Sequence, residues 1–247
     1  MDRREFLKKS AMAVAAGTVM ASPIGAVVAQ DSKNHENKQI HNMKVLLVNG
    51  SPRENGNTHL ALMEAAKQLE KNGIGSEMLQ IGRQAVHGCV ACGYCHGKGH
   101  CVFDDDLCNR AIDLMAQCDA IIVGSPTYYG QPNGTVLSLI QRMSYAASSV
   151  MQNKPAAAVA VCRRGGATAV YQTLLMPFQM QNMPIVTSQY WNIVYGRSEG
   201  EAALDTEGLQ TMRTMADNMA FLLKRIHADG EPKYPTREAW QPKHFIR

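Results

Sequence analysis

The chain has 247 residues and a formal net charge of +4, which is close to neutral and gives no argument for nucleic acid binding. No apolar run in its interior approaches the ~20 residues that a membrane span needs. A chain of this length fits one domain with a sizeable core once a targeting segment is set aside.

Residues 1–29 are expected to be a targeting segment and not part of the fold. The sequence DRREFLK resembles the twin-arginine export motif, with Asp2 where that motif usually has Ser or Thr. A weakly apolar run at 11–21 and a small-residue cleavage site ending at Ala29 follow in the order of a signal peptide. We therefore expect twin-arginine export to the periplasm or another extracytoplasmic compartment, with a flexible lead-in at 30–42. A disordered basic tail is the alternative.

The first expected element of the fold is a strand from Val45 to Val48. This short apolar run, rich in β-branched residues, is typical of a strand that is buried on both faces. Small and polar residues follow, and helical spacing of apolar residues begins at Leu60. The loop between ends in Asn57 and Thr58, which are suited to cap a helix. Such a strand, loop and helix N-terminus favour an anion, because N–H groups and the helix dipole point toward it.

The residues of this loop indicate which anion it binds. The loop lacks the Gly-Lys-Ser/Thr ending of a nucleotide P-loop and the Gly-x-Gly-x-x-Gly of a dinucleotide site. The hydroxyl and amide groups of Ser51, Asn57 and Thr58, with the guanidinium of Arg53, suit a single terminal phosphomonoester. The alternative is an ordinary capped helix that follows a strand.

Strand and helix patterns alternate along the rest of the chain. The further expected strands are 77–81, 120–123, 156–161 and 184–187, and the expected helices are 104–117, 133–147, 168–183 and 206–226. This alternation predicts an α/β fold with a parallel sheet between two helix layers. Five strands fit the flavodoxin-like, doubly wound order 2-1-3-4-5, which places FMN between strands 1 and 3. We expect this domain at 43–230, and a tail at 231–247 that packs on a neighbouring subunit or on its own domain.

Two further loops follow the third and fourth expected strands, at the sheet edge where the phosphate loop also lies. The first loop contains Pro126, Thr127, Tyr128, Tyr129 and Gly130. Its two tyrosines can lie against a flat ring. In the second loop Gly165 and Gly166 let the backbone approach a planar ligand, and Arg163 and Arg164 can offset an anionic flavin. The alternative is that both are ordinary solvent loops.

A glycine-rich stretch at 87–103 carries four cysteines with the spacing C-x2-C-x2-C-x5-C. They are Cys89, Cys92, Cys95 and Cys101. Thiolates select iron-sulfur clusters, zinc or copper(I), and the first three cysteines repeat the rhythm of bacterial ferredoxins. Zinc on the four thiolates, or two disulfides in an exported protein, are the alternatives. The stretch is expected on the side of the sheet where the flavin crevice opens.

The sequences NGSPRENGNT and SPTYYGQPNGTVLSLIQRM and the later glycine pair resemble the NADPH-dependent FMN reductase and iron-sulfur flavoprotein branch of the flavodoxin-like superfamily. The resemblance covers residues 43–196. It implies that the phosphate is held by Ser51, Arg53, Asn57 and Thr58, and that the ring is lined by Pro126, Thr127, Tyr128, Tyr129, Gly130 and Gly165. It also implies a [4Fe–4S] cluster on the four cysteines, although many similar reductases keep some of them without a cluster. A homodimer or homotetramer with the flavin covered by the partner is implied as well.

These observations predict a redox flavoprotein that passes electrons between a small-molecule or protein donor and acceptor through FMN and the cluster. The donor is expected to be NAD(P)H or a reduced electron carrier. No catalytic side chain is expected, because the cofactor carries this chemistry. The alternatives are a cluster-free NAD(P)H-dependent FMN or quinone reductase, a non-catalytic flavodoxin-like carrier, and a thiol-disulfide or metal-binding module.

Overall fold

The computed structural model describes residues 42–239, 241 and 243. The expected signal peptide at 1–29 and nearly all of the lead-in lie outside these residues. The strands are β1 (Lys44–Asn49), β2 (Gly75–Gln80), β3 (Ala120–Tyr128), β4 (Gln131–Pro132), β5 (Ala156–Cys162) and β6 (Ile193–Tyr195). The helices are α2 (Asn57–Lys71), α3 (Cys108–Ala116), α4 (Gly134–Ala146), α5 (Ser148–Met151), α6 (Ala167–Met180), the 3-10 helix η3 (Glu201–Leu204) and α7 (Thr206–Ile226).

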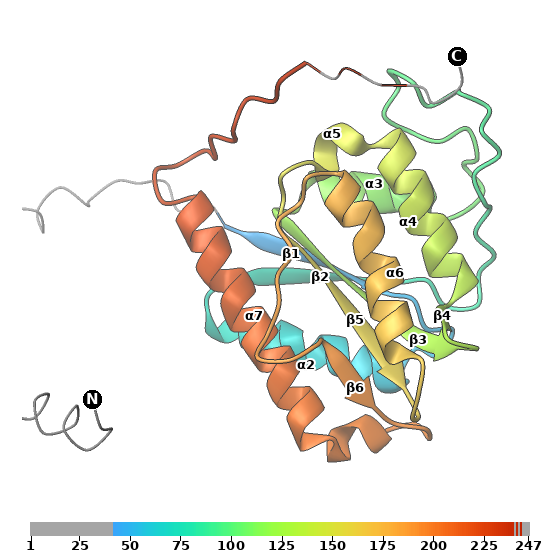
Figure 1. Ribbon diagram of the computed structural model, residues 1–247, viewed down its shortest axis with the longest axis vertical. Helices are drawn as coiled ribbons and strands as arrows, with labels where there is room; N and C mark the ends of the chain where they lie inside the picture. The colour runs from blue at the N-terminus through green and yellow to red at the C-terminus, as the bar shows by residue number, and fades with distance from the viewer. Residues whose placement is uncertain (1–41, 240, 242, 244–247) are drawn as a thin grey trace, which may run out of the picture. The chain divides into compact units, whose positions relative to one another are not determined.

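The strands form one sheet between two helix layers (Figure 1). The order is β2-β1-β3-β5-β6, all parallel, and the short β4 pairs antiparallel with β3. Residues that alternate along each strand enter two cores. Val45 and Leu47 pack against α2 and α7, whereas Leu46 and Val48 face the side covered by α3, α4 and α6. Burial on both faces explains why these strands read as continuous apolar runs.

The α/β fold and its parallel, flavodoxin-like sheet are confirmed, but the five-stranded order was wrong. The sheet has six strands, because β3 extends to Tyr128 and turns back into β4. The last strand was also misplaced. In the segment 184–187, Ile185 makes only an isolated bridge to Ala156, and the strand that pairs with β5 lies at 193–195.

Two helix starts differ from the sequence prediction. The helix expected from Asp104 begins at Cys108, because the preceding aspartates make other contacts: Asp106 pairs with Arg142, and Asp104 accepts a hydrogen bond from Asn109. At α2 the N-cap is Gly56, and no side chain caps it, so the predicted capping role of the residues that follow was wrong.

The long helix α7 has the predicted bounds, and α6 contains Pro177 in its interior. None of the helices in the described part of the chain is both long and apolar enough to cross a membrane. Beyond α7 the described tail has no regular structure, and Arg237 donates to the Gln181 carbonyl oxygen at 3.2 Å. This part of the tail therefore contacts its own domain.

Candidate functional site

The loop from residue 50 to 56 connects β1 to α2 and is fixed by hydrogen bonds. The Ser51 N–H donates to Asn49 Oδ1 (3.0 Å), and Ser51 Oγ accepts from the Arg53 N–H (3.1 Å). Gln80 Nε2, at the end of β2, donates to the Ser51 carbonyl oxygen (2.7 Å). The loop is thus held in one conformation at the N-terminus of a 15-residue helix, where an anion is favoured.

The ends of β1 and β3 approach closely beside this loop. The Gly50 N–H donates to the Gly124 carbonyl oxygen at 2.8 Å. A Cβ at Gly50 would lie 2.8 Å from that oxygen and 2.8 Å from Val136 Cβ, so a side chain is excluded there. Asn133, the N-cap of α4, donates from Nδ2 to the Gly50 carbonyl oxygen (2.7 Å). Three elements therefore meet at the crevice between β1 and β3.

The Asn57 side chain does not cap α2 and makes two long-range hydrogen bonds instead. Its Nδ2 donates to the Ser198 carbonyl oxygen (2.8 Å), and its Oδ1 accepts from the Ala202 N–H (3.1 Å). A Cβ at Gly196 would lie 2.7 Å from Asn57 Nδ2, so this approach needs glycine. The side chain therefore ties the start of α2 to the loop before η3.

A pocket of about 230 Å³ lies where these elements meet, and we call it the crevice pocket. Seven predicted residues line it: Ser51, Arg53, Asn57, Thr58, Pro126, Thr127 and Tyr128. Arg163 and Arg197 also line it, so three guanidinium-bearing residues surround it together with Arg53. Thr127 Oγ1 is buried and has no hydrogen-bond partner. Three cationic residues, a helix N-terminus and an unpaired buried hydroxyl fit a bound phosphorylated ligand.

The other three predicted flavin residues lie outside this pocket. Tyr129 is fully exposed, with a left-handed φ of 51°, and Gly130 has φ of 77° in the turn to β4. A Cβ at Gly166 would lie 2.9 Å from Gly130 Cα, so the loops after β3 and β5 touch. The structure therefore brings Gly165 and Tyr129 to the same edge of the sheet, but in exposed turns beside the pocket.

Arg197 lines the crevice pocket but was not predicted from the sequence as a site residue. It follows β6, the strand that was expected elsewhere, so its position at a strand end was not apparent. The Glu201 carboxylate accepts from the N–H groups of Ser198 (2.9 Å) and Arg197 (2.7 Å). These hydrogen bonds, first that from Ser198, lower the pKa of Glu201. An ionised Glu201 thus fixes the backbone that presents Arg197 to the pocket.

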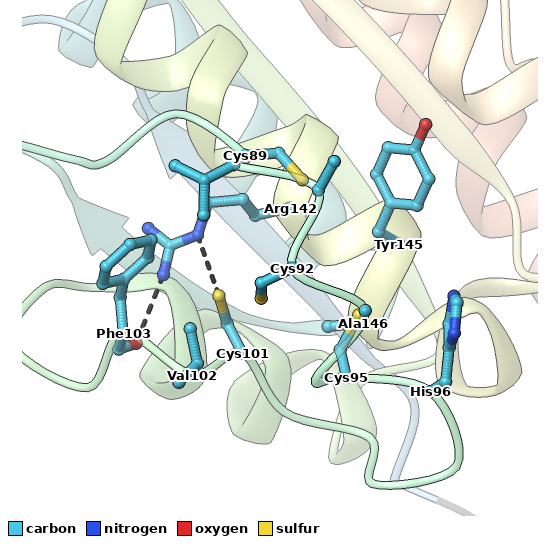
Figure 2. Close-up of a pocket in the computed structure, with 13 residues that line it drawn as sticks. Cys89, Cys92, Cys95, His96, Cys101, Val102, Phe103, Arg142, Tyr145 and Ala146 are labelled. Carbon is cyan, nitrogen blue, oxygen red and sulfur yellow. Dashed lines mark hydrogen bonds between the residues drawn. The ribbon is translucent and has the colours of Figure 1, made fainter.

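A second pocket, of about 350 Å³, is lined by all four cysteines of the predicted metal site, and we call it the cysteine pocket (Figure 2). The backbone between them includes Ala91 and Gly93 at φ of 52° and 72°, which lets the loop curl around the pocket. Among the described residues, three possible metal-ligand atoms lie within 4.8 Å of one another only at His87, Asp105 and Asp106. The four thiols therefore share one pocket without three of their sulfurs meeting at that distance.

The chemistry of this donor set still fits a thiolate-bound metal centre, because four soft ligands line one hollow. Arg142, which sequence reasoning missed, also lines it and donates from Nε to Cys101 Sγ at 3.2 Å. A signal was present in the sequence: a charged residue stands between Ile140 and Met143, at a position where α4 is otherwise buried and apolar. Asn109 accepts from the Cys101 N–H at 2.8 Å and so fixes the backbone of that cysteine.

The other three cysteines, Cys108, Cys118 and Cys162, are buried. Burial raises the pKa of Cys108 to about 12 and that of Cys118 to about 11. Both are therefore neutral thiols at physiological pH and not ready metal ligands. Cys162 lies at the end of β5 and lines the crevice pocket, where burial also raises the pKa of its thiol.

The two pockets lie at different places along α4. Asn133, at its N-terminus, holds the loop of the crevice pocket, whereas Arg142 and Ala146 line the cysteine pocket. At 1.5 Å per residue, Ala146 is about 18 Å along the helix from Gly134. No described residue lines both pockets. The cysteine pocket is therefore separate from the crevice pocket of its own chain.

A doubly wound parallel sheet with an anion loop at the crevice between its first and third strands defines a flavodoxin-like protein. Residues 43–197 match the sequence profile of the family described as NADPH-dependent FMN reductase, and the chain belongs to that family. An iron-sulfur flavoprotein of Methanocaldococcus jannaschii is 31% identical over 192 residues, covering 74% of this chain and 99% of that protein. An iron-sulfur flavoprotein of Methanosarcina thermophila is 28% identical over 195 residues, covering 76% of this chain and 100% of that protein.

Solved structures agree on the fold. RosB, determined with bound 8-demethyl-8-formylriboflavin-5'-phosphate, superposes with a TM-score of 0.60 at 14% identity, covering 83% of this chain and 94% of RosB. A flavodoxin from the Archaea gives a TM-score of 0.50 at 15% identity, covering 74% of this chain and 99% of that flavodoxin. At these identities the likeness establishes the flavodoxin-like fold alone.

Proposed function

We propose that this protein is an FMN-dependent oxidoreductase that passes electrons between a donor and an acceptor through FMN and a [4Fe–4S] cluster. The observation that carries the proposal is the crevice pocket, where three arginines and a buried, unpaired Thr127 hydroxyl lie beside a helix N-terminus. This is the arrangement that a flavin phosphate requires at the edge of such a sheet. Membership of the FMN reductase family supports the same ligand.

In this proposal the chain binds and orients the flavin. Ser51, Thr58 and Arg53 hold the phosphate, and Tyr128 and Thr127 lie along the crevice toward the ring. Pro126 also lines the pocket, and Gly130, Tyr129 and Gly165 would flank the ring from the exposed turns beside it. FMN supplies one-electron and two-electron chemistry when bound.

The four cysteines would hold the cluster, which supplies a one-electron relay. Support comes from the single pocket that all four line and from two relatives whose names state an iron-sulfur flavoprotein. Because the two pockets lie far apart along α4, a second copy of the chain is proposed to bring its cysteine pocket to this flavin. The protein is therefore proposed to be a homodimer or homotetramer, with NAD(P)H or a reduced carrier as donor.

A cluster-free NAD(P)H-dependent FMN or quinone reductase is the second candidate. The observation that favours it is the family match over residues 43–197, whose description names an NADPH-dependent FMN reductase and no cluster. In that case the cysteine pocket has no metal, and the flavin alone carries the reaction. The two candidates differ in iron content and agree on the crevice pocket.

Protein purified without oxygen tests both. We expect flavin absorbance bands with a broad shoulder that bleaches on reduction, about four irons per chain, and steady-state oxidation of NAD(P)H or of a reduced carrier. Flavin with no iron after anaerobic reconstitution would favour the reductase without a cluster. Colourless protein that does not take up FMN would contradict the proposal altogether.

Export by the twin-arginine pathway is also proposed, for a segment outside the described residues. Replacing Arg3 and Arg4 together by lysine should leave the precursor in the cytoplasm, because the pathway recognises the arginine pair. Cell fractionation measures this, with Lys8→Arg and Lys9→Arg as a control that keeps the charge of the segment. Unchanged export of the double lysine variant would remove the argument for an extracytoplasmic location.

A further inference from the structure

Arg142 is buried in a place where a charge is costly. It lies on α4 among buried apolar residues, and only 1% of its side chain is exposed. A guanidinium that leaves water needs compensating partners, and losing one of them leaves a buried unpaired charge. The contacts of this side chain should therefore indicate what it is for.

All of the contacts go to the cysteine stretch and the residues that close it. The Nε–H group donates to Cys101 Sγ (3.2 Å), and one terminal N–H group donates to the Phe103 carbonyl oxygen (3.2 Å), as Figure 2 shows. The other terminal nitrogen donates to the His87 carbonyl oxygen (3.3 Å) and forms an ion pair with Asp106, whose side chain is only 2% exposed.

These contacts join the two ends of the stretch. His87 precedes the first cysteine, and Phe103 and Asp106 follow the last one. The rings of His87 and Phe103 stack with centroids 4.5 Å apart, and the Arg142 guanidinium lies over the Phe103 ring at 5.4 Å. One rigid helix therefore fixes where the stretch begins, where it ends and where the sulfur of Cys101 lies.

We propose that Arg142 is a positioning residue that sets the reduction potential of the cluster. The inference rests on the proposed function, because it requires that Cys101 ligates the cluster. Reduction adds one electron and hence one negative charge to a cluster. An N–H donor to a ligand sulfur and a nearby positive charge both favour that reduced form. The Asp106 carboxylate neutralises part of the positive charge of Arg142. Arg142 therefore raises the reduction potential of the cluster, and Asp106 lowers it.

The ion pair allows a test in which two substitutions act in opposite directions. Arg142→Met removes the N–H donor and the positive charge, so the midpoint potential of the cluster should fall. Arg142→Lys keeps the positive charge but loses the several N–H donors of the guanidinium, so the midpoint potential should fall by less. Asp106→Asn leaves the guanidinium uncompensated, so the potential should rise. We expect about a tenfold change in the equilibrium constant for reduction with Arg142→Met, or about 59 mV for a one-electron couple.

The measurement is an anaerobic redox titration of each loaded variant, followed by the paramagnetic signal of the reduced cluster. Arg142→Met leaves Asp106 buried without its partner and can fail to fold, but Arg142→Lys and Asp106→Asn still carry the test. Unchanged potentials in these two variants, or shifts of the same sign, would overturn the proposal. If the unmutated protein takes up no iron under these conditions, it is the proposed function that fails, which is a distinct result.

Discussion

Cys95→Ser should remove the iron from the protein, about four atoms per chain, and leave FMN bound. A cubane cluster requires all four thiolates, and serine does not replace the soft sulfur ligand. Cys95 is a half-buried residue of the cysteine pocket, which shares no described lining residue with the crevice pocket. The ratio of iron to flavin after anaerobic reconstitution measures the effect.

Cys118→Ala is the matched control. Cys118 is buried in the core, and burial raises the pKa of its thiol to about 11, so it offers no thiolate for a metal at neutral pH. This variant should keep both iron and FMN. Four irons retained by Cys95→Ser, or stoichiometric zinc in the unmutated protein, would defeat the assignment of the cluster to these cysteines.

Most of the fold could be predicted because local pattern and tertiary burial agree. The runs that became β1, β3 and β5 are apolar on both faces, and few other environments suit such runs. The last strand was different, because 184–187 and 193–195 are both short and rich in β-branched residues. Only the pairing with β5 distinguishes them. Buried Asn192 donates to the carbonyl oxygens of Ala158 and Val186, a long-range constraint that local pattern does not contain.

The start of α3 was also mispredicted because it depends on a contact between residues far apart in the sequence. Aspartates before an apolar helical pattern indicate a helix N-terminus, where the dipole favours them. In the structure burial raises the pKa of Asp106, yet hydrogen bonds from Arg142 and from the N–H groups of Cys108 and His87 outweigh this and hold it below its usual value. The partner Arg142 lies 36 residues away in sequence. A single sequence does not show that two residues this far apart form an ion pair.

The crevice pocket was predictable to the extent that strand order was. The carboxyl ends of parallel strands meet at one edge, so Ser51 and Thr127 were expected to come together, and they line one pocket. Arg197 was not expected, because it depends on the position of β6. The separation of the two pockets depends on α4, which runs from its N-cap Asn133 beside the crevice pocket to Ala146 in the lining of the cysteine pocket.

Arg53→Ala should weaken FMN binding by about 10-fold to 150-fold, since a hydrogen bond to a charged group contributes roughly 1.5–3 kcal/mol. Arg53 follows Ser51 in the loop fixed by Gln80, and it lines the crevice pocket with Arg163 and Arg197. The two remaining guanidinium groups should keep some affinity. The dissociation constant from flavin fluorescence quenching measures the loss.

Riboflavin, which lacks the phosphate, separates this effect from damage to the pocket. Its dissociation constant should be unchanged in Arg53→Ala, because only the phosphate contact has been removed. Arg83→Ala is the matched control: Arg83 shares the neighbouring surface hollow with Arg53 but does not line the crevice pocket. It removes an equal charge nearby and should change FMN affinity little, and this small change should shrink with added salt. Equal losses for FMN and riboflavin in Arg53→Ala would show that this arginine shapes the pocket and does not hold the phosphate.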